Sequence, residues 1–181
     1  MKEEKSSLIF GMALQCAPLF LKIKPAELFC VSSDYKKEIQ DFLKGTEVSV
    51  VLLGGKKTGQ VFLLYQKEKF KQMLKEADRI KLLKQMGYPA KGFRDQLTCL
   101  KERFQQYCSR EGEFPHEIGI FLGYPVEDVQ GFMKNQGKDY LYCGYWKVYS
   151  NVEQTKKLFD MYDRAKRIMY FIASERSTKR G

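Results

Sequence analysis

The chain has 181 residues, of which 44% are apolar and 14% aromatic, and it carries a formal net charge of +10. This length and apolar content suffice to bury the core of one domain without covalent cross-links. The five cysteines are an odd number and form no Cys-x-x-Cys pair, so the sequence indicates neither a disulfide framework nor a zinc knuckle, and no segment approaches the roughly 20 apolar residues that span a bilayer.

The amino-terminal part predicts a helix, a short strand and a second helix. Apolar residues at helical spacing indicate an opening helix over residues 6–16, which ends before Pro18. A strand is expected over residues 28–31. A serine and an aspartate, both typical caps, then predict a helix over residues 33–43.

The next segment is typical of a β-hairpin. Two apolar, β-branched runs at residues 48–53 and 61–65 flank a glycine-rich stretch at residues 54–59. The glycine spacing is that of a phosphate loop, but Gln60 and Val61 stand where that loop requires Lys and then Ser or Thr, and a strand follows instead of a helix. We therefore interpret the stretch as a hairpin turn and not as a nucleotide site.

The rest of the chain predicts helices and one further strand. Apolar residues recur at helical spacing over residues 70–80 and 93–107. Residues 140–149 alternate as a single aromatic strand, and Ser150 with Asn151 then caps a final helix. Together these elements predict an α+β fold, in which a small sheet of about four strands, including the hairpin, is covered by several helices.

The domain organisation and the location follow from composition. The chain contains no repeat and no low-complexity linker, so we expect a single α+β domain over residues 1–173 and a frayed basic tail over residues 174–181. A secretion signal begins with basic residues, whereas this chain has Glu3 and Glu4 in that region. Cysteines without a disulfide pattern are typical of a reducing compartment. We expect a cytoplasmic protein without a membrane partner.

The positive net charge raises the question of nucleic-acid binding. The excess lies mainly on helical stretches where Lys and Arg alternate with apolar residues, which is the ordinary pattern of a solvated face. Residues 118–133 match a helix-turn-helix pattern, but the second helix begins with the carboxylates of Glu127 and Asp128. A DNA-binding or regulatory protein is therefore the alternative hypothesis. Its candidate contacts are Gln130, Lys134, Asn135 and Gln136.

His116 is the only histidine of the chain, and it follows Pro115 at an expected helix start. The helix dipole there favours a neutral imidazole, which can bind a metal or haem, act as a general base, or cap the helix. The neighbouring Glu117 does not complete the His-Glu-x-x-His motif of zinc proteases. A structural use of His116 and a functional one both stay open.

Cys143 and Trp146 lie in the aromatic segment. Cys143 with His116 is the one Cys/His combination near enough along the chain to suggest nucleophilic catalysis, although a buried strand cysteine is the more frequent case. Trp146 and the tyrosines beside it could form the wall of a binding site for a flat ligand. Alternatively, these side chains are part of the hydrophobic core. The candidate ligand-binding residues are His116, Glu117, Tyr124, Cys143, Tyr145 and Trp146.

Three segments carry a family resemblance: Cys16-Ala17-Pro18 with Lys24-Pro25-Ala26-Glu27-Leu28-Phe29, the run from Phe114 to Phe132 (Phe-Pro-His-Glu-Ile-Gly-Ile-Phe-Leu-Gly-Tyr-Pro-Val-Glu-Asp-Val-Gln-Gly-Phe), and Gly144-Tyr145-Trp146-Lys147-Val148-Tyr149. Here the chain resembles the bacterial domain-of-unknown-function family numbered 3793. The resemblance covers most of the chain and implies a bacterial cytosolic protein. It supplies no activity and no catalytic residue.

Our leading hypothesis is a protein that binds a small ligand, a cofactor or a metal-containing group near the lone histidine and the aromatic strand. The residues indicate no particular cofactor and no particular metal ion. Nucleic acid is the partner in the helix-turn-helix alternative. A Cys/His-dependent enzyme that uses Cys143 and His116 is the second alternative.

Overall fold

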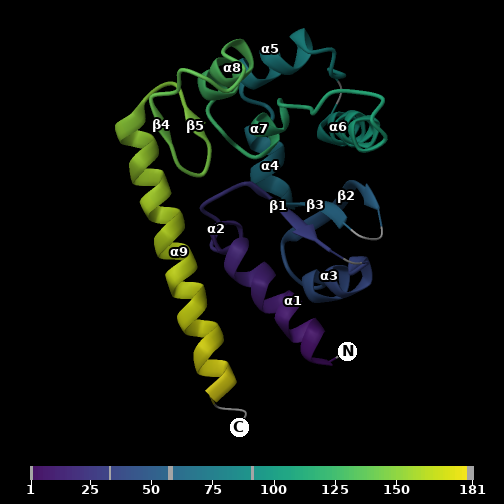
Figure 1. Ribbon diagram of the computed structural model, residues 1–181, viewed down its shortest axis with the longest axis vertical. Helices are drawn as coiled ribbons and strands as arrows, with labels where there is room; N and C mark the ends of the chain where they lie inside the picture. The colour runs from purple at the N-terminus through teal and green to yellow at the C-terminus, as the bar shows by residue number, and fades with distance from the viewer. Residues whose placement is uncertain (1, 33, 57–58, 91, 179–181) are drawn as a thin grey trace.

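A computed structural model describes residues 2–32, 34–56, 59–90 and 92–178 and confirms the α+β class (Figure 1). An antiparallel sheet forms with the strand order β1-β3-β2, so that β3 is its central strand. The two strands of the predicted hairpin are β2 and β3, and residues 57–58 of their turn lie outside the described part of the chain. The strands are β1 (Ala26–Val31), β2 (Val48–Lys56) and β3 (Gly59–Gln66).

The first three helices cover one face of this sheet. Phe62 and Leu64 of β3 point to that face, because alternate side chains of a strand point to opposite sides. They pack in one buried cluster with Met12, Leu19 and Ile39. The helices are α1 (Lys2–Gln15), α2 (Ala17–Phe20) and α3 (Lys36–Leu43).

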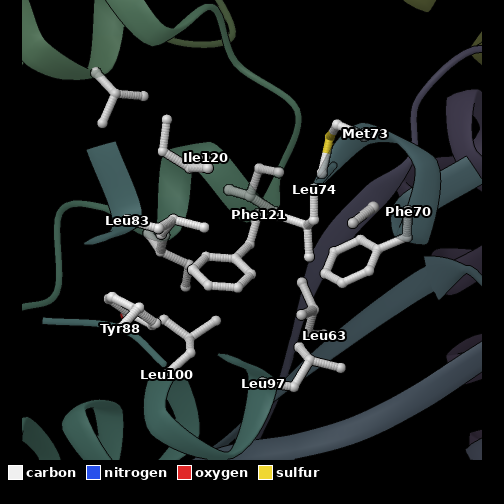
Figure 2. Packing of buried hydrophobic residues seen from close by; sticks show 14 of the residues in the cluster. Leu63, Phe70, Met73, Leu74, Leu83, Tyr88, Leu97, Leu100, Ile120 and Phe121 are labelled. Carbon is white, nitrogen blue, oxygen red and sulfur yellow. The ribbon is translucent and has the colours of Figure 1, made fainter. Parts of the chain in front are cut away.

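Leu63 points to the opposite face of the sheet, where it joins a larger buried cluster. Figure 2 shows Leu63 in one cluster with Phe70, Leu83, Leu100 and Phe121, which come from four different helices. Each of these side chains is almost fully buried, and burial of one such side chain is worth about 1.5–3 kcal/mol. The helices over this face are α4 (Lys67–Met73), α5 (Ala77–Gln85), α6 (Phe93–Cys108), α7 (Ile118–Phe121) and α8 (Val126–Lys134).

The final helix α9 (Val152–Thr178) runs along α1 and α2 (Figure 1). Beside its amino-terminal half lies a short hairpin of β4 (Tyr142–Cys143) and β5 (Lys147–Val148). Helix α9 continues into the segment where we expect a frayed tail, and residues 179–181 lie outside the described residues. A third buried cluster joins the hairpin to α9 and consists of Trp146, Val148, Phe159 and Tyr162.

The single aromatic strand predicted over residues 140–149 is wrong. The segment folds back on itself, so that Tyr142 pairs with Val148 across the hairpin. The N–H of Gly144 donates to the carbonyl oxygen of Trp146 at 3.1 Å and closes the turn. An alternating pattern reports extended backbone, and it does not report where the chain reverses. The hairpin forms a two-stranded sheet of its own instead of adding a fourth strand to the main sheet.

The helix predicted over residues 70–80 is divided into α4 and α5. The chain turns between them, and the turn lets Arg79 reach across to the segment around α7. Its guanidinium donates to the carbonyl oxygens of Ile120 and Tyr124 at 3.2 and 2.9 Å. Apolar residues keep their helical spacing through the break, so the periodicity did not reveal it.

The remaining elements follow the predictions with small shifts. The helices expected over residues 6–16 and 93–107 are α1 and α6, and the expected strand over residues 28–31 is part of β1. Helix α3 begins at Lys36, later than predicted. The N–H of Lys36 donates a hydrogen bond to the side chain of Asp34 at 3.5 Å. Ser33 lies outside the described residues. Within the described ranges, none of the helices is long and apolar enough to cross a membrane.

Candidate functional site

A cavity of about 420 Å³, called the aromatic pocket below, lies among β1, α7, α8 and the β4–β5 hairpin. Most of its lining is apolar, from Leu28 of β1 to Phe132 of α8. Five of the six candidate ligand-binding residues line it, although they are spread along the segment from the turn before α7 to the hairpin. They are His116, Tyr124, Cys143, Tyr145 and Trp146.

Trp146 forms one wall of the aromatic pocket together with Tyr124. The two rings stack at 4.4 Å between centroids and 22° between planes. Phe159 of α9 meets the indole edge-on at 4.5 Å, so the wall is supported from behind. The indole N–H donates to Oδ2 of Asp128 at 2.8 Å, which fixes the orientation of the ring.

Asp128 holds the wall in place through its buried carboxylate. Besides Trp146, its Oδ1 accepts hydrogen bonds from the N–H of Tyr149 at 2.8 Å and from the N–H and hydroxyl of Ser150 at 3.0 and 3.1 Å. This residue therefore joins α8 to the hairpin and to the start of α9. The sequence shows Asp128 only as a carboxylate at the start of a predicted helix, and no local pattern distinguishes that position from a buried, hydrogen-bonded one.

His116 lies at the mouth of the aromatic pocket and is exposed. Its ring sits between Phe114 and Phe132, at 5.2 and 5.0 Å between centroids. No hydrogen bond joins the imidazole to another residue in the described part of the chain, so both ring nitrogens are free to meet a ligand. The predicted helix start is displaced, because His116 lies in the turn before α7.

Tyr124 links the aromatic pocket to a buried ion pair that the sequence did not indicate. Burial, and then the charge of Glu27, raise the pKa of the Tyr124 hydroxyl above its usual value. Lys24 is 1% exposed, pairs with Glu27 at 2.8 Å, and places its ammonium 5.4 Å from the centre of the Tyr124 ring. Burial and a hydrogen bond to Asp163 likewise raise the pKa of Tyr145.

Glu117 points away from the aromatic pocket, unlike the other five candidates. It is 4% exposed, and its Oε1 accepts hydrogen bonds from Arg103 at 2.8 Å and from the hydroxyl of Tyr88 at 3.0 Å. The guanidinium of Arg103 also lies 4.5 Å from the centre of the Tyr88 ring. Burial and the charge of Glu117 raise the pKa of Tyr88, which therefore stays a hydrogen-bond donor.

Cys143 lies in β4 with an exposed side chain, in contrast to the buried strand cysteine that is the more frequent case. It lines the same pocket as His116. Within the described ranges, however, no hydrogen bond joins the thiol to the imidazole. The Cys/His enzyme hypothesis therefore stays a prediction, without the nucleophile-to-base contact that such catalysis uses.

The candidate nucleic-acid contacts lie at the carboxyl end of α8. Gln130 and Lys134 are exposed one turn apart, and Glu127 is exposed one turn earlier on the same face. Asn135 is half-buried, and Gln136 follows it outside the helix. The first helix of the proposed motif, α7, is a single turn. The DNA-binding hypothesis stays a prediction, and the carboxylate on this face opposes it.

Metal binding finds no support among the residues that the structure places. Within them, no three or more His, Cys, Asp or Glu side chains are grouped so that they could hold an ion.

Comparison with known proteins matches the chain to a family of unknown function. The model of a family described as "Protein of unknown function (DUF3793)" matches residues 12–180, which is nearly the whole chain. Neither a curated protein nor a solved structure matches.

Proposed function

We propose that this chain, which belongs to the DUF3793 family, binds a small, flat and mostly apolar ligand in the aromatic pocket. The observation that carries the proposal is the cavity itself, about 420 Å³ in volume and walled by aromatic rings with a few polar groups at its edge. Ligand pockets commonly have volumes of roughly 300–1,000 Å³ and this kind of lining. The stacked pair of Tyr124 and Trp146 offers a flat wall for a ring system.

The charges around the pocket favour a ligand that is neutral or anionic. Asp128 is the one carboxylate among the lining residues, and hydrogen bonds from three residues already occupy both of its oxygens. Lys147 also lines the pocket, and its ammonium donates to the carbonyl oxygen of Gly137 at 2.8 Å, which leaves further N–H donors. His116 adds a second polar group at the mouth.

Protection of a thiol tests whether a ligand enters this pocket. Cys143 and Cys30 are both exposed, but only Cys143 lines the aromatic pocket, so Cys30 is an internal control. The probe is anilinonaphthalene sulfonate, an aromatic anion that contains a flat naphthalene ring. We expect it to slow alkylation of Cys143 by N-ethylmaleimide at least about five-fold, as measured by peptide mass spectrometry, and to leave Cys30 unchanged. Equal rates at Cys143 with and without a saturating probe would refute the proposal.

Two substitutions at His116 separate its polar role from its stacking role. The His116→Phe variant keeps a ring between Phe114 and Phe132 and loses the nitrogens, whereas His116→Ala loses both. If the imidazole donates a hydrogen bond to the sulfonate, both variants bind the probe about five- to ten-fold more weakly, since such a bond is worth about 1–1.5 kcal/mol. If His116→Phe binds the probe with wild-type affinity, His116 contributes only its ring to the wall of the pocket and no hydrogen bond to the ligand.

A further inference from the structure

We infer that a second cavity, on the other side of the wall formed by Phe114, His116 and Phe132, is a binding site for an organic cation. This cavity, called the acidic pocket below, has a volume of about 740 Å³. The three wall residues line both cavities, and the remaining residues of the two linings differ. The site is therefore distinct from the aromatic pocket and does not rest on the function proposed for it.

The aromatic side chains of the acidic pocket form a continuous row. Tyr107 meets Phe114 edge-on, with 5.2 Å between centroids and 89° between planes. Phe114 is followed by His116 at 5.2 Å and then by Phe132 at 5.0 Å. The faces of Tyr and Phe rings attract cations, and groups of such rings recognise alkylated ammonium ions.

Two carboxylates give the acidic pocket its polarity. Glu113 is exposed, lines the pocket, and forms no ion pair with any residue that the structure describes. Glu117 also lines it and is 4% exposed; its Oε1 accepts both hydrogen bonds from Arg103 and Tyr88, while Oε2 accepts none from the described residues. Arg103 balances the charge of Glu117. The charge left for a ligand is therefore that of Glu113.

The rest of the lining suits the alkyl part of such a cation. Met86 and Met133 line the pocket, and their flexible, polarizable side chains adapt to the shape of a ligand. The acidic pocket has no counterpart of Lys147, which lines only the aromatic pocket. The two cavities on either side of the shared wall therefore differ in the sign of the charge that they favour.

Choline and its carbon isostere dimethylbutanol test this inference, because the two molecules differ in the charged nitrogen and are nearly equal in shape. We expect the methyl resonance of choline to shift upfield and to saturate as the full chain is added in a proton NMR titration, since the methyl groups lie over ring faces. The affinity of dimethylbutanol is expected to be at least about five-fold lower, the factor that one cation–π contact supplies. Equal affinity of the two molecules, or no saturable shift of choline, would overturn the inference.

Substitutions at two exposed positions assign the effect to the acidic pocket. Glu113→Gln removes the free charge at constant shape, and we expect it to weaken choline at least about three-fold and to leave dimethylbutanol unchanged. Tyr107→Leu removes an exposed ring and is expected to reduce the upfield shift at saturation. Glu127→Gln changes an exposed carboxylate outside the pocket and serves as the matched control. Equal losses in Glu113→Gln and Glu127→Gln would contradict the assignment.

Discussion

The buried carboxylate of Asp128 is the residue on which the aromatic pocket most depends. It receives the indole N–H of Trp146 on one oxygen and donors of Tyr149 and Ser150 on the other. Because these partners lie far from Asp128 in the sequence, no local sequence pattern predicts the hydrogen bonds. The nearness of His116 to the aromatic segment, in contrast, was visible in the sequence, and most of the candidate residues were found for that reason.

Asp128→Asn is expected to destabilise the fold by about 2–3 kcal/mol, because an amide turns an N–H₂ toward groups that are themselves donors and weakens bonds made to a charged acceptor. Guanidinium unfolding followed by circular dichroism measures this change. The adjacent Glu127→Gln replaces an exposed carboxylate and should stay within about 0.5 kcal/mol of the wild type. Similar free energies of unfolding for the two variants would show that the hydrogen bonds of Asp128 carry little stability.

At the scale of elements, the hairpin of β4 and β5 was the part of the fold that sequence patterns described least well. Amphipathic helices such as α6 were predicted within a residue or two, since their spacing depends on the one face that they bury. The aromatic segment was read as one strand because alternation says nothing about which partner a strand pairs with. The position of the hairpin depends on α9, because Phe159 of that helix packs against Gly144 and Trp146 of the hairpin.

Gly144→Ala tests the contact between the hairpin and α9. A methyl group at residue 144 would lie 2.3 Å from Cε2 of Phe159, so we expect a loss of about 1–3 kcal/mol and a red shift of the Trp146 emission. Gly11→Ala is the matched control, because open space surrounds that exposed position in α1. There the same change should stabilise the helix by about 0.5–1 kcal/mol. A neutral Gly144→Ala would mean that the hairpin does not rest on Phe159.

At the scale of the whole molecule, the stability of the fold depends on pH through tyrosines in two of the three buried clusters. Burial raises the pKa of Tyr88, Tyr124 and Tyr162 above the ordinary value of about 10. These phenols stay neutral in the folded state at a pH where the unfolded chain has begun to lose their protons. Because the unfolded state then binds fewer protons, the stability that they contribute is complete below about pH 10 and is lost as the pH rises.

The free energy of unfolding should therefore fall steadily as the pH is raised above about 10. Urea unfolding at a series of alkaline pH values measures this, with ultraviolet absorbance of phenolate as a parallel signal. Tyr162→Phe, which removes one of the titrating groups from the buried cluster beside Trp146, should flatten the dependence. A free energy that stays constant while phenolate absorbance develops in the folded state would contradict the burial of these hydroxyls.

Emission of Trp146 during titration with anilinonaphthalene sulfonate tests the central claim most directly, because the chain has a single tryptophan and that residue walls the aromatic pocket. We predict saturable quenching with one-site stoichiometry and sensitised probe emission, both weakened in His116→Ala, while circular dichroism stays unchanged. Unaltered Trp146 emission, or quenching that rises linearly without saturation in the folded protein, would contradict a ligand site in this pocket.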